Sequence, residues 1–123
     1  YELIALPLKL EGLDAAPVEY DPRLRERFFG DWEGASHKNY SKAWQNDALD
    51  PLEAANGVEP THAVRARLLA VVEGLERRFA GRDIVLVSHG DPLMILQAAF
   101  RGVDPTRHRS LPYFATAELR RLN

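Results

Sequence analysis

Two residues of this sequence stand where their side chains could do acid–base or phosphate chemistry, and the first is His89. It lies in the segment Ser88-His89-Gly90, directly after the apolar run over residues 84–87. A continuous β-branched run predicts a strand that is buried on both faces, as in a parallel sheet. His89 would then lie at the carboxyl end of a strand and at the start of a helix, where α/β proteins bind ligands.

A helix start beside His89 would favour an anion, because it offers free backbone amides and the positive end of the helix dipole. An imidazole there can donate to a phosphate oxygen, move a proton or act as a nucleophile. Gly90 would let a ligand approach the backbone closely. The alternative is structural: His89 ends the strand and Gly90 serves the turn. We expect His37, His62 and His108 to be surface residues, since they lie in polar or loop contexts and none has a second histidine at zinc-ligand spacing.

The second candidate is Glu26, in a stretch that is dense in charged and aromatic residues. Desolvation by Phe28, Phe29 and Trp32 would raise the pKa of its carboxyl, as a general acid at neutral pH requires. The arginine on either side would lower that pKa. The alternative interpretation is that residues 23–27 form a solvated charged stretch without a catalytic role.

The elements that must position these residues follow from hydrophobic periodicity and from cap and turn residues. In chain order we expect a strand-like piece over 17–20, helices over 36–47 and 61–80, a strand over 84–87, a helix over 93–100 and an edge strand over 116–122. Asp91 is the expected N-cap of the last helix and Pro92 its first residue. A helix that packs before a buried strand indicates an α/β protein.

Composition excludes several classes of protein. The chain has 123 residues and 46% hydrophobic residues, which suits one domain over residues 1–123. Its formal charge of −2, with both signs scattered, gives no basic block for nucleic acid or anionic lipid. The chain has no cysteine, which fits a reducing compartment, so we expect a cytoplasmic protein. Its apolar runs are far shorter than the roughly 20 residues that span a membrane.

Three segments, in order, resemble the histidine phosphatase superfamily, which includes the cofactor-dependent phosphoglycerate mutases. Residues 24–34 are similar to its Leu-x-Glu-x-x-x-Gly-x-x-Glu-Gly stretch, and residues 85–90 to its strand that ends in Ser-His-Gly. Residues 57–59 lie where the family has Gly-Glu-Ser, with Glu59 retained for a site role or as helix N-terminal charge and Pro60 in place of the serine. The resemblance implies a three-layer α/β/α phosphoglycerate mutase-like fold with a mostly parallel sheet.

The resemblance also implies roles for the site residues. Glu26 would be the general acid that protonates the leaving oxygen, His89 a phosphate ligand, and Gly90 with the following helix start an amide-lined floor. The family's nucleophile is another histidine, in an Arg-His-Gly segment on the first strand, and this sequence contains no Arg-His-Gly. We expect that segment and strand upstream of Tyr1, so that this chain would be an N-terminally incomplete, inactive domain. The mechanism requires no metal and no cofactor.

The short interval between Gly34 and Gly57 favours a phosphomonoester phosphatase, since the mutases of the family carry a long insertion there. A mutase must protect its phosphoenzyme from water, which a short-loop site does poorly. The alternatives are a phosphoglycerate mutase and a catalytically inactive phosphate-binding or scaffolding module. The expected partner is a small phosphorylated substrate, with no nucleic acid and no membrane. An apolar strand edge at residues 84–87 would also allow a homodimer formed by strand pairing.

Overall fold

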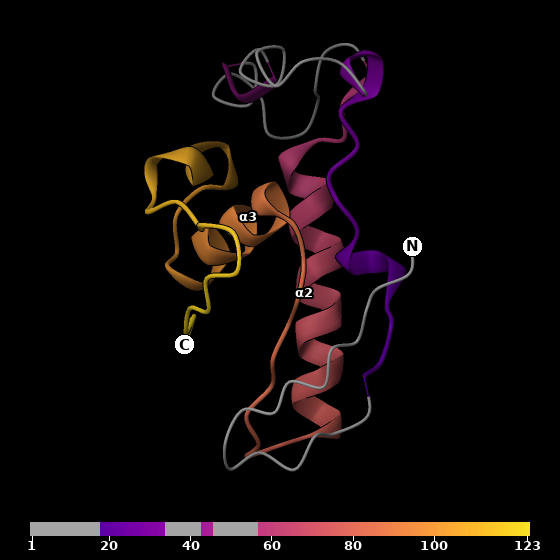
Figure 1. Cartoon of the computed structure of the whole chain (residues 1–123), viewed down its shortest axis with the longest axis vertical. Helices are drawn as coiled ribbons and strands as arrows, with labels where there is room; N and C mark the ends of the chain where they lie inside the picture. Colours follow the sequence, from indigo (N-terminus) through magenta and orange to yellow (C-terminus); the bar gives the residue numbers. More distant parts are fainter. Residues whose placement is uncertain (1–17, 34–42, 46–56) are drawn as a thin grey trace.

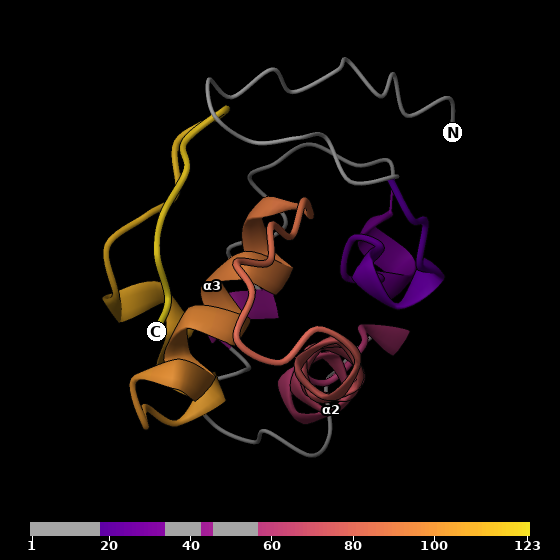
Figure 2. The same cartoon turned by 90° about the horizontal axis from the view of Figure 1, so that it is seen from below.

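The structure is a computed structural model, and it describes residues 18–33, 43–45 and 57–123. This part includes two α-helices and three short 3₁₀ helices: η1 (Pro22–Leu24), η2 (Gly30–Trp32), α2 (Thr61–Arg78), α3 (Gly90–Phe100) and η5 (Pro105–Ser110). Helix α3 packs between α2 and η5 (Figure 1). A view along α2 shows η1 on a different side of this helix from α3 (Figure 2).

Helix α2 confirms the helix that periodicity predicts, although it ends at Arg78 and not at Ala80. Val64, Leu68 and Val71 recur one or two turns apart and are buried, while charged residues cover the outer face. Gly81 follows with a φ of +74°, a conformation that glycine adopts without strain. The buried face of α2 therefore supplies one half of the core.

Helix α3 supplies the other half and begins earlier than predicted, at Gly90. Its Ile95 and Leu96 form the main buried cluster with residues of α2. The predicted N-cap was wrong: His89 occupies that position, and Asp91 lies inside the helix. The carboxylate of Asp91 cannot cap the helix, since it is engaged in buried contacts described below. Pro92 lies in the first turn, where its missing N–H disrupts no helical bond.

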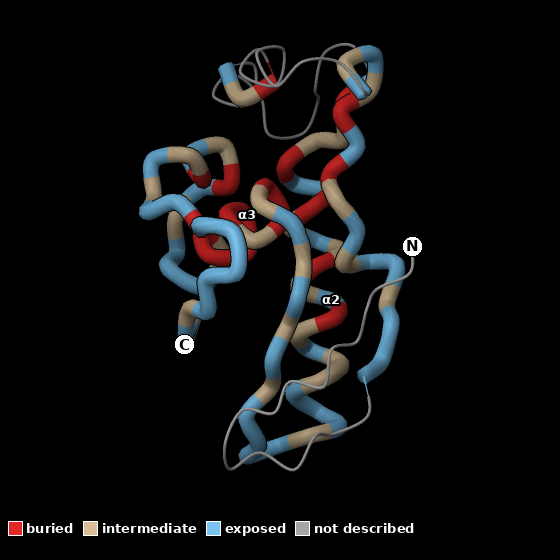
Figure 3. The backbone as a smooth tube through the Cα atoms, in the orientation of Figure 1, coloured by how far each residue is buried: buried red, intermediate tan, exposed pale blue. Residues whose placement is uncertain are grey.

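The described residues contain no β-strand. Residues 84–87 are extended, but the predicted burial on both faces was wrong, because Val85 is 48% and Val87 65% exposed. Leu86 packs against the cluster between α2 and α3, whereas no described strand covers the opposite side (Figure 3). One-sided contact therefore produces alternating burial.

The predicted edge strand over 116–122 was also wrong, since a turn occupies its start and Ala117 has a φ of 61°. Residues 18–20 of the predicted strand-like piece are not a strand either. Residues 43–45 are helical, as predicted, and the rest of the expected helix over 36–47 lies outside the described residues. The mostly parallel sheet thus stays a prediction.

No helix in the described ranges is long and apolar enough to cross a membrane.

Candidate active site

Glu26 and His89, far apart in the sequence, lie together in the structure. Oε2 of Glu26 is 3.8 Å from Nδ1 of His89. Glu26 stands in the extended segment between η1 and η2, and His89 is the N-cap residue of α3. The two side chains are 41% and 45% exposed, so a solute can reach both. The structure thus brings together the two residues that the sequence singles out.

Burial raises the pKa of Glu26 above its ordinary value, and the charges of Asp91 and Glu33 raise it further. Two contacts oppose them: the backbone N–H of Arg27 donates to Oε1 at 2.8 Å, and the charge of His89 also lowers the pKa. The net direction is the one that a general acid needs, because it keeps the proton available at a higher pH.

The start of helix α3 beside this pair has no side-chain cap. Gly90 is the first residue of α3, and the side chain of His89 makes no capping hydrogen bond there. A Cβ atom added at Gly90 would lie 3.9 Å from the hydroxyl oxygen of Tyr113, which is ordinary van der Waals contact. The first amides of α3 receive no hydrogen bond from the side chain of His89, so they are candidate donors to an anion.

A buried ionic cluster centred on Asp91 lies behind the pair. The carboxylate of Asp91 accepts hydrogen bonds from Nη1 of Arg27 at 3.0 Å and from Nε1 of Trp44 at 3.1 Å. It also lies 2.9 Å from Nε2 of His108, whose Nδ1 is 2.7 Å from the carbonyl oxygen of Pro105. Burial raises the pKa of Asp91, but the bonds and charges of His108 and Arg27 outweigh burial and lower it.

Two predictions fail at this cluster. His108 is fully buried, and not a surface residue, because both of its ring nitrogens find partners inside the molecule. Arg27 is fully buried as well, so the solvated-stretch interpretation of residues 23–27 does not hold for it. Its guanidinium binds Asp91, whereas that of the exposed Arg25 donates to the Pro22 carbonyl.

The cluster connects the two candidate site residues through the backbone. Arg27 is the residue after Glu26, and Asp91 is the second residue after His89. An ion pair between Arg27 and Asp91 therefore joins the segment of Glu26 to the start of α3. Sequence reasoning missed this pair, since an arginine in a charged stretch and an aspartate in a first helical turn are both common on surfaces.

Glu59 holds the Glu26 segment from another side. Its backbone N–H donates to the Phe28 carbonyl at 2.7 Å, and its Oε1 accepts from the Phe28 N–H at 3.2 Å. Its carboxylate pairs with Arg67 at 2.9 Å, and its carbonyl accepts from Nε of Arg27 at 2.8 Å. These contacts give Glu59 a structural part in supporting the backbone around Glu26, and the two roles expected for it stay predictions.

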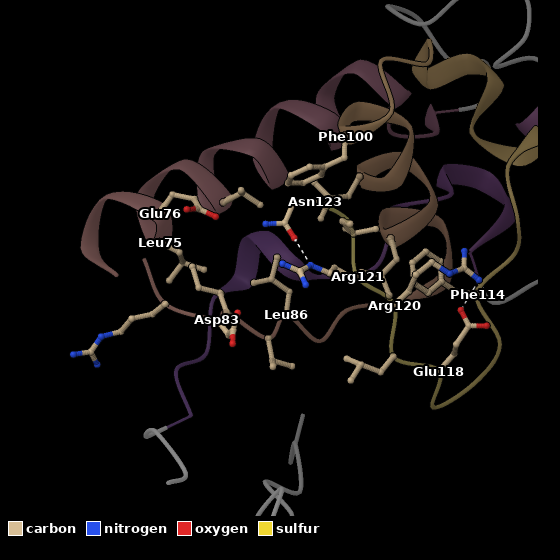
Figure 4. A pocket seen from close by; sticks show the side chains of 18 residues that line it. Leu75, Glu76, Asp83, Leu86, Phe100, Phe114, Glu118, Arg120, Arg121 and Asn123 are labelled. Atoms are coloured by element: carbon tan, nitrogen blue, oxygen red, sulfur yellow. Dashed lines mark hydrogen bonds and ion pairs between the residues drawn. The ribbon is translucent and has the colours of Figure 1, made fainter. Parts of the chain in front are cut away.

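A cavity of about 510 Å³ lies elsewhere, between α2, the extended residues 84–87 and the C-terminal segment (Figure 4). Leu75, Leu86 and Phe100 are among its lining residues, and neither Glu26 nor His89 is. Within the described ranges, no group of three or more acidic or histidine side chains could hold a metal ion. The candidate site is therefore the start of α3 with Glu26 and His89.

Residues 5–123 match the family model described as the histidine phosphatase superfamily (branch 1), and the chain belongs to this superfamily. Among its relatives is the glucosyl-3-phosphoglycerate phosphatase of Mycolicibacterium vanbaalenii, 36% identical over 101 residues, which cover 71% of this chain and 44% of the relative. The protein of the same name from Mycobacterium tuberculosis (strain CDC 1551 / Oshkosh) is 35% identical over 107 residues, covering 75% and 47%. The chain thus spans less than half the length of these relatives.

Similar solved structures agree with this family membership. Bacillus stearothermophilus YhfR is 33% identical with a TM-score of 0.63, over 76% of this chain and 48% of that chain. The structure titled Mycobacterial hydrolase 2 is 30% identical with a TM-score of 0.61, over 76% and 45%. These neighbours have phosphoglycerate mutase-like folds. The family predicted from the three sequence segments is confirmed.

Proposed function

We propose that the protein containing this chain is a phosphomonoester hydrolase that works through a phosphohistidine, with Glu26 as general acid and His89 as phosphate ligand. The observation that carries the proposal is the 3.8 Å approach of these two side chains beside the start of α3, which has no side-chain cap. Membership of the histidine phosphatase superfamily and two relatives named as phosphatases support the class of reaction. The three-layer fold with a mostly parallel sheet is part of the same proposal.

In the first half of the reaction, the phosphate of the substrate lies at His89 and the first amides of α3. The nucleophilic histidine, expected in an Arg-His-Gly segment outside this chain, forms a bond to phosphorus while the bond from phosphorus to the leaving oxygen breaks. The protonated carboxyl of Glu26 gives its proton to that oxygen, so the product leaves as an alcohol. Donors at His89 and Gly90 stabilise the charge on the transferring group.

In the second half, the phosphorus–nitrogen bond breaks. Water attacks the phosphohistidine, and the Glu26 carboxylate takes up one proton from that water. Inorganic phosphate leaves, the nucleophilic histidine is regenerated, and Glu26 is again protonated. The raised pKa of Glu26 suits both steps, because it favours the acid form at the start of each turnover.

The substrate class is a small phosphomonoester. Since both relatives are named glucosyl-3-phosphoglycerate phosphatases, glucosyl-3-phosphoglycerate is the first compound to test. The full-length protein should release inorganic phosphate from it. Rapid quenching of the reaction should trap a phosphohistidine that is stable in base. Release of phosphate without a trapped phosphohistidine would contradict the covalent route, and transfer to a second hydroxyl without release would favour a mutase.

The role of Glu26 is tested by Glu26→Gln in the full-length protein. We expect kcat to fall about 100-fold or more with an alkyl phosphate, whose leaving oxygen needs the proton, and by less than about tenfold with p-nitrophenyl phosphate. The matched control is Glu73→Gln on the exposed side of α2, which should change neither rate. Equal losses on both substrates would remove Glu26 from the role of general acid.

A further inference from the structure

The guanidinium of Arg67, on α2, lies against the backbone of the Glu26 segment. Its Nη1 donates to the carbonyl oxygens of Arg23 at 2.6 Å and Arg25 at 3.0 Å, and its Nη2 reaches the carbonyl of Glu26 itself at 3.4 Å. Its Nε and Nη2 also donate to the two carboxylate oxygens of Glu59, at 2.9 and 3.0 Å. One side chain therefore binds three carbonyls and one carboxylate.

These bonds matter because residues 25–29 belong to no helix or strand. Backbone carbonyls in such a segment need partners from elsewhere, and Arg67 supplies them on the N-terminal side of Glu26. Glu59, held by Arg67 through a two-pronged ion pair, binds the backbone of Phe28 on the C-terminal side. The guanidinium of Arg67 thus holds the backbone directly before Glu26 and, through Glu59, the backbone after it.

We propose that Arg67 is a positioning residue that fixes Glu26 for proton transfer. The inference rests on the proposed function, in that Glu26 is taken as the general acid. Arg67 contacts Glu26 only at the backbone carbonyl, so it acts through Glu26 and not on the substrate. Proton transfer depends steeply on the distance between the donor and the leaving oxygen. Because the position of the Glu26 carboxyl depends on its backbone, a backbone that moves also moves the proton donor.

Helix α2 contains a matched control. Arg78 also forms a two-pronged ion pair, with Glu19 at 3.0 and 2.8 Å, and so ties α2 to the same N-terminal part of the described chain. Both of those side chains are 56% exposed, whereas Arg67 and Glu59 are 10% and 14% exposed. Comparing substitutions at Arg67 and Arg78 separates positioning of Glu26 from general attachment to α2.

The experiment compares Arg67→Lys with Arg78→Lys in the full-length protein, using an alkyl phosphate and p-nitrophenyl phosphate. Lysine keeps the charge but cannot present five N–H groups in a planar fork. We expect Arg67→Lys to lower kcat on the alkyl phosphate by about 10- to 100-fold and on p-nitrophenyl phosphate by about twofold. KM should stay within about twofold, since His89 and the α3 amides are untouched. Arg78→Lys should leave both rates unchanged.

A pH profile provides a second readout. Because burial is what raises the pKa of Glu26, a looser segment admits water and lowers that pKa. The alkaline limb of kcat/KM for Arg67→Lys should therefore move to lower pH than in the unsubstituted protein. A purely structural loss of active molecules would reduce the amplitude of the profile and leave its limbs in place.

Equal loss on both substrates, or behaviour like Arg78→Lys, would overturn the positioning role while the leaving-group dependence of Glu26→Gln still stood. If Glu26→Gln itself showed equal losses, the proposed function would fail first. Should Arg67→Lys not fold, as judged by circular dichroism, Glu59→Gln decides the matter. This substitution weakens the ion pair between Arg67 and Glu59 from the side of Glu59. It should lower kcat more on the alkyl phosphate than on p-nitrophenyl phosphate, by smaller factors than Arg67→Lys, and an equal loss on both substrates would overturn the inference.

Discussion

The front of the candidate site, formed by Glu26 and His89, is exposed to solvent, whereas its back, formed by Arg27, Asp91 and His108, is buried. At the front, Glu26 and His89 are each more than two-fifths exposed and lie 3.8 Å apart. At the back, Arg27 and His108 are fully buried and Asp91 is 5% exposed, with short contacts joining them. The carboxyl at the front has a raised pKa and the one at the back a lowered pKa. The two candidate site residues keep access to solvent, whereas the charged groups behind them are buried in short contacts with one another.

The strongest test of this difference is to remove the negative charge of Asp91 at the back of the site. Asp91→Asn should lower the free energy of unfolding by about 3–5 kcal/mol, because it takes away the carboxylate that compensates the buried guanidinium of Arg27. Urea unfolding at 25 °C measures the loss. The matched control is Asp104→Asn at the exposed start of η5, which should change stability by at most a few tenths of a kcal/mol, because asparagine caps about as well as aspartate. Similar losses in the two variants would contradict a special role for Asp91.

Acid provides a smaller and graded test of the same cluster. The pKa of Asp91 lies below its ordinary value of 3.8 in the folded protein, so its contribution is fully present above about pH 4. That contribution is lost as the pH falls through the folded-state pKa. We expect the unfolding free energy of the unsubstituted protein to fall more steeply below about pH 4 than that of Asp91→Asn. Parallel curves for the two proteins would refute the assignment.

The front of the site should show the opposite sign and the smallest effect. Since the folded state raises the pKa of Glu26, its ionised carboxylate is mildly unfavourable at neutral pH, and Glu26→Gln should stabilise the protein there. The gain should stay below about 1 kcal/mol, because solvent screens a side chain that is 41% exposed. It should vanish below about pH 4, where the carboxyl is protonated in both states. Thermal unfolding at pH 7 and pH 3.5 checks the sign, which a loss of stability at pH 7 would contradict.

Local patterns predicted the front of the site better than the back. The resemblance of the motifs around Glu26 and His89 to the histidine phosphatase superfamily was what led us to expect the two residues in one site, and periodicity was enough to predict α2. The Arg27–Asp91 bond joins residues 64 apart in the sequence, and the His108–Asp91 contact joins residues 17 apart. Such pairs leave no trace in periodicity or spacing, so nothing local distinguishes them from surface charges.

The extended elements were predicted least well for a related reason. A β-branched run such as 84–87 favours an extended backbone, but whether both faces are buried depends on neighbours that the run itself does not encode. Helix α2 needs only one apolar face and a partner helix, which α3 supplies. At residues 116–122 the start of the segment is a turn, in which Ala117 has a left-handed conformation.

Pro92 has a consequence for how firmly the helix start can hold an anion. A helix begins with N–H groups that no helical carbonyl accepts, and proline removes one of them from the first turn of α3. Gly90 and Asp91 keep theirs, while the N–H of Leu93 already donates to the His89 carbonyl. Two donors in place of three weaken the hold of the helix start on an anion. In the proposed hydrolase, a weaker hold on inorganic phosphate would speed release of the product.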